Sequence, residues 1–426
     1  MKTFGIVAEY NPFHNGHAWQ LREARRILGE DCAAVAVMSG SFTQRGEPGI
    51  MNKWDRAAAA MACGVDLVIE LPQVFASASA GRFAYGGIEL LTAAGVVQTV
   101  VFGSESGQLD KLSELAKIVS DENEDYKQVF RDCLDRGLSW PAARQQAAAQ
   151  VAGPETAALL EHSNNILAIE YLKTLAKVDK RRRPKALTLP RQGSSYNDAS
   201  LPGNSTFASA TAIRGEISCQ IASSETGSLE ARLLKNLAGH MPSASLAHLL
   251  ASSAAGRKLV LPEDLAPQIL TQLRATPPEL LDLYAYMQEG LGRRLAEAAR
   301  RPTPDANGRI AALLEQADTR RFPRTRIQRA LVAMLMQIKA DDMIATHSAP
   351  QYIRVLGFSK KGRHLLKLMR KYASLPIITR ASDFLEFGRD SAVMQQAAYD
   401  LLATDIRALA AGSYCGSDFD TEVVIG

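Results

Sequence analysis

The N-terminal part of the chain alternates between short apolar runs and amphipathic stretches, and this alternation constrains the fold more than any other feature. Strand-like runs and helix-like stretches follow one another at residues 3–8 (strand), 15–28 (helix), 32–38 (strand), 52–63 (helix), 65–71 (strand), 83–94 (helix) and 99–102 (strand). Strands separated by helices at this spacing form a parallel sheet with helices on both faces. The sequence therefore predicts an α/β, doubly wound domain.

The rest of the chain is mostly helical in pattern. A further strand is expected at residues 185–189, a loop rich in Gly, Ser, Asn and Pro at 191–207, and a helix from Ser209. After about residue 220 strand patterns nearly disappear. We therefore expect a sheet domain over residues 1–220 and an α-helical region over 221–426, which holds a basic segment at about 320–370 and an acidic tail at 416–426.

Composition excludes several classes of protein. Hydrophobic residues make up 46% and charged residues 22% of the chain, which is typical of a globular protein with a full core. No apolar run approaches the roughly 20 residues that cross a bilayer, and the N-terminus turns polar too early for a signal peptide. The five cysteines form no C-x-x-C pair, which favours reduced thiols over a zinc site. We expect a cytoplasmic protein without a membrane partner.

The charge of the chain is unevenly distributed. The formal net charge is +4, but the segment between Arg321 and Arg370 holds eleven lysines and arginines against two aspartates. Such a segment favours a polyanionic partner, and its aromatic residues suit single-stranded RNA loops rather than DNA. A solvated helical face is the alternative. The candidate RNA-binding residues in this segment are Arg326, Arg354, Lys360, Lys361 and Arg363. Arg181, from an earlier run of arginines, is a further candidate.

The sequence His14-Asn15-Gly16-His17 follows the first expected strand, where a helix should begin. Ligands of doubly wound sheets bind at this edge, and a helix N-terminus attracts phosphate. Gly16 allows close approach of the backbone, and the two imidazoles share one helical face, where they can stabilise a reacting phosphate. Zinc binding or simple helix capping is the alternative, but no third ligand lies nearby in the sequence. The pattern predicts a nucleotide site with His14 and His17 as catalytic residues.

Four residues outside this motif are further candidates. Lys53 and Arg56 follow the second strand and could face a triphosphate, with surface salt bridges as the alternative. Gly103 ends another strand, where a glycine lets a nucleotide approach the backbone. From its position alone, Asn165 could equally contact a ligand or cap a helix.

The longer string from Glu9 to His17, EYNPFHNGH, resembles the bacterial tRNA(Met) cytidine acetate ligases. These belong to the nucleotidyltransferase-like (HIGH-type) superfamily, which also includes class I aminoacyl-tRNA synthetases. Further matching stretches extend the resemblance from residue 4 to about residue 370, and they include MSGSF at 38–42, KWDR at 53–56, GVDLVIELP at 64–72, FGSE at 102–105, NNIL at 164–167, ATAIR at 210–214 and YIRVLGF at 352–358.

The resemblance implies a two-step ligation. ATP and acetate form acetyl-adenylate and diphosphate, and the N4 amine of the wobble cytidine in the anticodon loop of elongator tRNA(Met) then attacks the acetyl carbon and releases AMP. Mg²⁺ is inferred to accompany ATP without a dedicated protein metal site. The resemblance places ATP at Val7, Ala8, Glu9, Tyr10, Asn11, Pro12, Phe13, His14, Asn15, Gly16, His17, Ala18, Trp19, Gln20, Gly103, Asn165 and Arg191.

Two other functions are open at this stage. An adenylyltransferase acting on a small phosphorylated metabolite would share the histidine motif, but would not need the long helical remainder. A non-catalytic RNA-binding protein would not need His14, Gly16 and His17 to be intact. One departure from the family is expected, because Asn197 stands where the family pattern has histidine. The sequence predicts neither an oligomeric state nor the residues of an acetate pocket.

Overall fold

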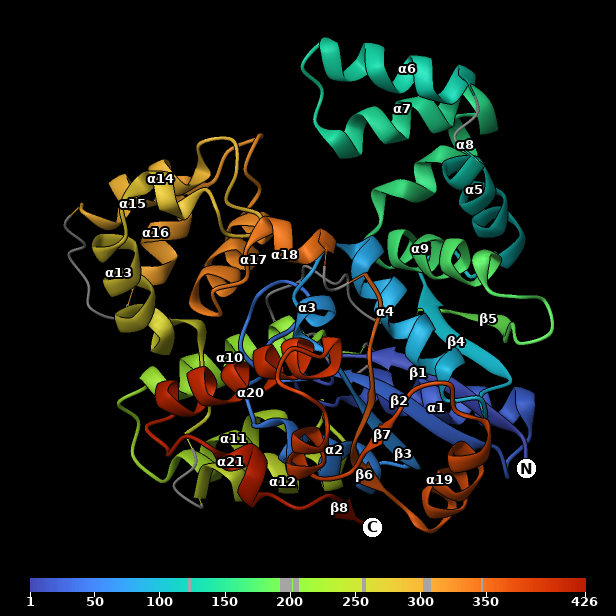
Figure 1. The fold of residues 1–426 in the computed structure, drawn as a ribbon. Coiled ribbons are helices and arrows are strands. Elements are labelled where there is room, and N and C mark those ends of the chain that lie inside the picture. The colour runs from blue at the N-terminus through green and yellow to red at the C-terminus, as the bar shows by residue number, and fades with distance from the viewer. Residues whose placement is uncertain (122–123, 192–200, 202–206, 255–257, 302–307, 346–347) are drawn as a thin grey trace.

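A computed structural model describes residues 1–426 except 122–123, 192–200, 202–206, 255–257, 302–307 and 346–347 (Figure 1). Among these residues one mixed sheet forms the centre of the molecule. Its strands are β1 (Thr3–Ala8), β2 (Ala33–Ser39), β3 (Leu67–Leu71), β4 (Thr99–Ser104), β5 (Lys185–Pro190), β6 (Ile353–Phe358), β7 (Ile377–Ile378) and β8 (Val424–Ile425).

The strand order is β5-β4-β1-β2-β3-β6-β7, with β8 paired to β6. Strands β1 to β5 are parallel, as expected, and β6 runs antiparallel to β3. The strand order reverses direction at β1, because the chain adds β2 and β3 on one side and β4 and β5 on the other. Ligands of doubly wound sheets bind beside such a reversal, outside the carboxyl ends of the strands.

Helices cover both faces of the sheet, because the parallel strands are apolar on both faces. In β2, Val35 and Val37 belong to one buried cluster, whereas Ala34, Ala36 and Met38 belong to another on the opposite face. This arrangement confirms the doubly wound fold.

The helices between the strands lie close to the expected positions. The first, expected at 15–28, is α1 (Asn15–Leu28). The other helices up to β5 are α2 (Lys53–Ala62), α3 (Gln73–Ala76), α4 (Ala80–Ala93), α5 (Leu109–Asp121), α6 (Glu124–Asp135), α7 (Trp140–Ala152), α8 (Pro154–Ala157) and α9 (Ser163–Lys177), with a 3₁₀ turn at Ala158–Glu161. Helices α6 and α7 pack side by side and project from the body as an arm (Figure 1).

Helices also dominate the chain after β5. They are α10 (Ala210–Ala222), α11 (Leu229–Leu237), α12 (Ser243–Ala254), α13 (Ala266–Ala275), α14 (Pro278–Leu281), α15 (Leu291–Ala299), α16 (Arg309–Ala317), α17 (Arg324–Leu335), α18 (Ala340–Ala345), α19 (Lys360–Tyr372), α20 (Ala392–Ala410) and α21 (Ser417–Asp420), with 3₁₀ turns at Pro262–Leu265 and Ala381–Glu386. Among the described residues, no helix is both long enough and apolar enough to span a bilayer.

The expected division into a sheet domain and a separate helical region is wrong in one respect. Strands β6, β7 and β8 come from the C-terminal half and extend the N-terminal sheet. The acidic tail also packs here, because Val424 and Ile425 pair with Gly357 and Phe358. The strand at 353–358 is short and contains an arginine, so its apolar pattern is hidden within the basic segment.

Candidate nucleotide site

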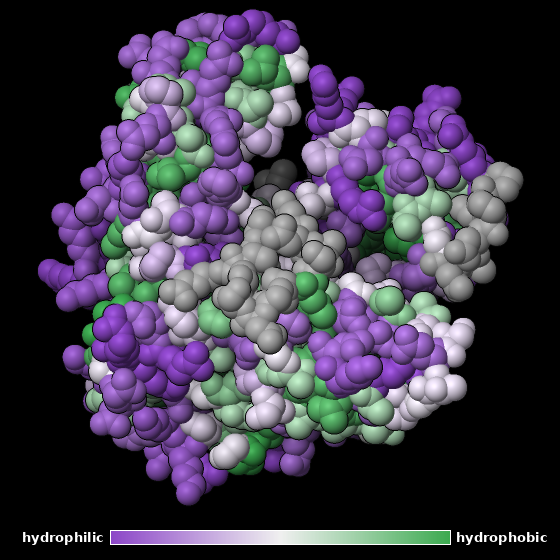
Figure 2. Space-filling view, turned by 180° about the vertical axis from the view of Figure 1, so that it is seen from behind, coloured by the Kyte–Doolittle hydropathy of each residue, from purple (hydrophilic) through white to green (hydrophobic). Residues whose placement is uncertain are grey.

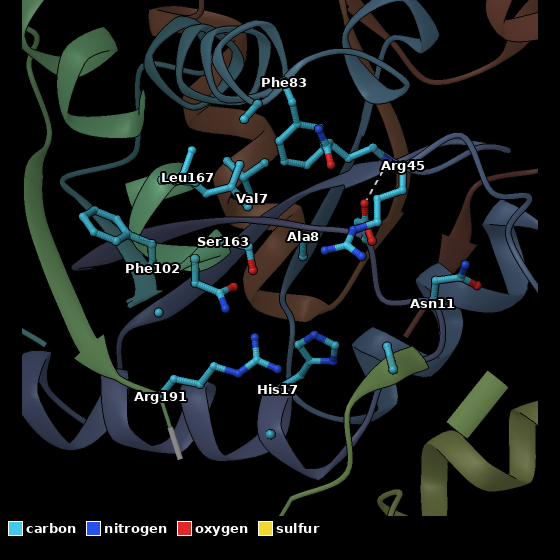
Figure 3. Close-up of a pocket in the computed structure, with 18 of the residues that line it drawn as sticks. Val7, Ala8, Asn11, His17, Arg45, Phe83, Phe102, Ser163, Leu167 and Arg191 are labelled. Carbon is cyan, nitrogen blue, oxygen red and sulfur yellow. Dashed lines mark hydrogen bonds between the residues drawn. The ribbon is translucent and has the colours of Figure 1, made fainter. Parts of the chain in front are cut away.

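A cavity of about 550 Å³ opens at the carboxyl edge of the sheet. The ends of β1, β4 and β5 and the N-termini of α1 and α9 all contribute to its wall (Figure 3). Its lining includes Val7, Ala8, His14, Gly16, His17, Phe102, Gly103, Ser163, Asn164 and Arg191. The expected site at the first strand-to-helix turn therefore coincides with a real cavity.

The two histidines are held by the backbone at the start of α1. His14 is the N-cap, and its Nδ1 accepts a hydrogen bond from the Gly16 amide at 3.1 Å. The Nδ1 of His17 accepts a hydrogen bond from the His14 amide at 3.2 Å, which completes a capping box. The two rings stack with centroids 3.8 Å apart. Because both Nδ1 atoms are acceptors, each neutral ring carries its proton on Nε2 and can donate it to a ligand.

Burial keeps both imidazoles neutral. Desolvation, with the nearby charges of Arg191 and Arg214, lowers the pKa of His14 to about 3. Desolvation and the neighbouring His14 and Arg191 hold the pKa of His17 well below its usual range. At neutral pH the pair therefore acts as hydrogen-bond donors and not as cations.

Gly16 is required by this packing. A Cβ at this position would lie 2.9 Å from Cε1 and 3.0 Å from Nδ1 of His14. Any side chain would push the His14 ring off its cap, so the glycine of the motif preserves the histidine geometry as well as access to the backbone.

Two arginines extend into the cavity from opposite sides. Arg191, which follows β5, and Arg45, in the loop after β2, both extend toward the region of His17 (Figure 3). The loop is tied to β1, because the Gln44 amide donates to Oε1 of Glu9 at 2.8 Å. Arg191 was expected at the site. Arg45 was missed as a site residue, although its loop at the ligand edge is the signal that could have identified it.

The structure divides the expected ATP-binding segment 7–20 into two groups. Residues that line the cavity are Val7, Ala8, Glu9, Tyr10, Asn11, His14, Gly16, His17, Trp19 and Gln20. The others do not line the cavity. They are Pro12, Phe13, Asn15 and Ala18. Phe13 is fully buried in the core, and the Asn15 side chain donates to the Gly239 carbonyl at 2.9 Å. The geometry therefore does not support direct contact between ATP and these four side chains.

Gly103 lines the cavity, whereas Asn165 does not. The Asn165 side chain is fully buried, and its Oδ1 accepts hydrogen bonds from the amides of Glu105 and Ser106. It thus shapes the loop after β4, and the neighbouring Asn164 takes the lining position. The sequence predicted that Asn165 contacts ATP directly, whereas in the structure its side chain supports the loop after β4.

Lys53 and Arg56 are not phosphate ligands in this structure. Lys53 is fully buried, and its Nζ pairs with Glu70 at 2.9 Å and with Asp418 at 2.8 Å. Arg56 is also fully buried and donates to backbone carbonyls, including that of Glu9 at 2.8 Å. Both residues lie in the first turn of α2, whose N-terminus packs into the core. Their charged groups therefore stabilise the fold through buried ion pairs and hydrogen bonds.

Arg354 belongs to the same buried ion cluster and is not an RNA contact. It is 4% exposed, and its guanidinium pairs with Asp418 at 2.6 Å and with Glu70 at 3.5 Å. Asp418 thereby fixes the acidic tail. Arg326 also interacts within the protein, because it forms an ion pair with Glu289 at 3.0 Å and donates a hydrogen bond to the Tyr286 carbonyl.

The other expected RNA-binding cations are exposed but lie at the opposite edge of the sheet. β6 ends beside the first residue of β3, so Lys360, Lys361 and Arg363 at the start of α19 lie at the amino edge. Arg181 also lies there, shortly before β5 begins. The cavity opens at the carboxyl edge, so these cations and the cavity lie at opposite ends of the strands.

The cavity wall offers little to a metal ion. Within the part of the chain that the structure describes, no three His, Cys, Asp or Glu side chains form a metal-binding group. Glu9 is the only carboxylate among the described lining residues, and it already accepts from the Gln44 amide. Asn197, the expected departure from the family, lies outside the described residues.

Comparison with known proteins identifies the family. A family model described as HIGH Nucleotidyl Transferase matches residues 1–421. The tRNA(Met) cytidine acetate ligase of Acetivibrio thermocellus is 38% identical over 436 residues, covering 100% of both chains. That of Caldanaerobacter subterraneus is 38% identical over 422 residues, covering 99% of this chain and 98% of the relative.

Solved structures agree. The apo crystal structure of Thermotoga maritima TmcAL superposes with a TM-score of 0.90 at 33% identity, and covers 100% of this chain and 99% of its own. A second structure of that protein, bound with alpha-thio ATP, superposes with a TM-score of 0.87 at 32% identity and the same coverage. The chain therefore belongs to the tRNA(Met) cytidine acetate ligase family of HIGH nucleotidyltransferases.

Proposed function

We propose that this chain is an ATP-dependent ligase that acetylates the N4 amine of the wobble cytidine of elongator tRNA(Met). The proposal rests chiefly on the pair of neutral imidazoles at the N-terminus of α1. In both rings Nδ1 accepts a hydrogen bond from a backbone amide, so the Nε2–H group is the one that can donate to a ligand. Full-length similarity to relatives named tRNA(Met) cytidine acetate ligase supplies the substrates.

In the first step an acetate oxygen attacks the α-phosphorus of ATP, and the bond to the β,γ-diphosphate breaks. Negative charge grows on the α-phosphate oxygens in the transition state. Donors already aimed at those oxygens stabilise it without reorganising. The Nε2–H groups of His14 and His17 take this role, while Arg191 and Arg45 offset the charge of the triphosphate. The products are acetyl-adenylate and diphosphate.

In the second step the cytosine N4 amine attacks the acetyl carbon, AMP leaves, and the amine loses a proton. Mg²⁺ would be held by phosphate oxygens and water, because the described wall contributes only Glu9 as a carboxylate. When bound, it would neutralise charge on the triphosphate.

The experiment is an in vitro reaction of the purified chain with ATP, isotopically labelled acetate and elongator tRNA(Met), analysed by mass spectrometry of nucleosides. We expect labelled N4-acetylcytidine and AMP that depend on all three components, and neither product with a tRNA carrying uridine at the wobble position. Diphosphate release triggered by a phosphorylated metabolite without RNA would instead establish the adenylyltransferase. No turnover with any substrate would favour the RNA-binding protein.

A further inference from the structure

We propose that the rim of the cavity is the RNA acceptor subsite, where Trp140 stacks on an unpaired base and Arg329 binds a backbone phosphate of the same RNA strand. The inference rests on the proposed function, which requires a cytidine to reach the interior of the cavity. It concerns residues outside both the histidine motif and the basic surface of α19.

Trp140 is an exposed aromatic side chain held in a fixed orientation. It lines the cavity from the first turn of α7 and is 57% exposed, so it stands at the rim. Its ring meets Phe130 edge-on at 5.8 Å between centroids, and the guanidinium of Arg144 lies 5.4 Å from its ring centroid. Arg144 is in turn fixed by an ion pair with Glu170 at 2.7 Å.

An indole that is both exposed and oriented is suited to stacking. An indole offers a large, rigid apolar face, and a side chain already ordered loses little entropy when a partner binds. Nucleobases stack on such aromatic groups with little dependence on sequence.

Arg329 reaches the same cavity from α17, in the C-terminal helical part of the chain. Its Nε is buried and has no hydrogen-bond partner among the described residues. Its guanidinium lies 5.5 Å from the Tyr286 ring centroid, and burial, together with the like charges of Arg326 and Arg45, lowers its pKa. A largely desolvated cation near two others is costly, and an anion bound there removes the cost.

Packing fixes the position of Arg329. A Cβ at Gly46 would lie 2.6 Å from the carbonyl carbon of Gln328 and 2.7 Å from the Arg329 nitrogen. The loop after β2 therefore rests directly on the backbone of α17. This contact connects the helical region to the nucleotide cavity and sets Arg329 at a defined place on its wall.

The two residues come from separate parts of the chain, because Trp140 is on α7 and Arg329 is on α17, and both line the cavity. Figure 2 shows a hollow between the arm formed by α6 and α7 and the neighbouring C-terminal helices. A stacking aromatic and a phosphate-binding cation together are the usual means of recognising unpaired RNA. ATP would occupy the histidine end, so the base to be modified must enter past this rim.

The test compares the variants Trp140→Ala, Trp140→Phe and Arg329→Gln with the wild-type chain. Binding is measured by titrating a synthetic anticodon stem-loop of elongator tRNA(Met). We expect Trp140→Ala to weaken binding by about 5- to 100-fold, which corresponds to the loss of one stacked base. Trp140→Phe should restore most of the affinity. Arg329→Gln should weaken binding and flatten its salt dependence by about one unit on a log–log scale.

Acetate-dependent exchange of diphosphate into ATP, measured without RNA, should be unchanged in all three variants, with folding checked by circular dichroism. Tyr372→Ala serves as the matched control, because Tyr372 is 53% exposed on α19, away from the cavity. Unchanged stem-loop affinity in Trp140→Ala and Arg329→Gln would overturn the inference. An equal loss of exchange and RNA binding would also overturn it, because Trp140 would then belong to the nucleotide site. A wild-type chain that binds the stem-loop through Trp140 but shows no exchange would contradict the proposed function alone.

Discussion

Two groups of cations lie near the sheet, and they differ in what neutralises them. Lys53 and Arg354 are buried against Glu70 and Asp418. The described lining of the cavity contains one carboxylate, that of Glu9. It contains three arginines, which are Arg45, Arg191 and Arg329. A cation balanced by buried carboxylates supports the fold, whereas an excess of cations around a cavity marks a place for an anionic ligand.

The largest effect is expected when a cation is removed from the buried cluster. Lys53→Met should cost about 3–5 kcal/mol of stability, because it leaves Glu70 and Asp418 with one cation fewer in a site that excludes water. Urea unfolding followed by circular dichroism measures the change. Lys361→Met is the matched control on an exposed pair, and should change stability by less than about 1 kcal/mol. A stable Lys53→Met protein that loses ATP affinity would instead place Lys53 in the nucleotide site.

The second prediction concerns a residue of the cavity, where we expect activity to fall and stability to remain. His17→Ala should leave the fold intact and slow formation of acetyl-adenylate by about 10²- to 10³-fold, since it removes one donor to the reacting phosphate. Diphosphate exchange with acetate present measures the rate. His364→Ala, an exposed histidine on α19, should have no effect. Unchanged exchange in His17→Ala would remove His17 from the mechanism.

A third prediction concerns pH. The pKa of His14 falls from an unfolded value near 6.5 to about 3 in the folded chain, chiefly because of burial. Between these values the unfolded chain binds more protons, so this histidine makes stability fall as pH falls through that window. The slope reaches about 1.4 kcal/mol per pH unit.

His14→Asn keeps an N-cap acceptor and removes the titrating group. From pH 7 to pH 5 the wild-type chain should therefore lose about 2 kcal/mol more stability than the variant, measured by urea unfolding at each pH. Parallel losses in the two proteins would show that His14 titrates normally.

The smallest effect is expected at the amino edge. Replacing Lys360, Lys361 and Arg363 with alanine should leave diphosphate exchange unchanged, because α19 lies at the other end of the strands from the cavity. If these cations contact the body of the tRNA, its affinity should fall modestly and the salt dependence should flatten by about one unit per lost contact. A loss of turnover at saturating tRNA would contradict this separation of the two edges.

Local patterns were sufficient to predict the five parallel strands β1 to β5 and the main motif. The limits of β1 and α1 agree with the structure, because hydrophobic period and capping residues are local properties of the sequence. The positions of His14, Gly16 and His17 followed from the rule that ligands bind where a parallel strand meets its helix.

What sequence could not predict depends on partners distant along the chain. Lys53 and Arg354 looked available because Asp418, which pairs with both, lies in the tail. Arg329 lies in the basic segment, and nothing local in the sequence shows that α17 packs against Gly46. In the same way, Asn164 and Asn165 are adjacent in sequence, and only the turn of α9 decides which of them faces the cavity.

A crystal structure of this chain with a non-hydrolysable ATP analogue would show whether the two imidazoles bind the reacting phosphate. We expect the α-phosphate oxygens to lie within hydrogen-bond distance of Nε2 of His14 and His17, with Arg45 and Arg191 near the triphosphate. An analogue bound elsewhere, or bound in the cavity with its phosphates turned away from both imidazoles, would contradict this expectation.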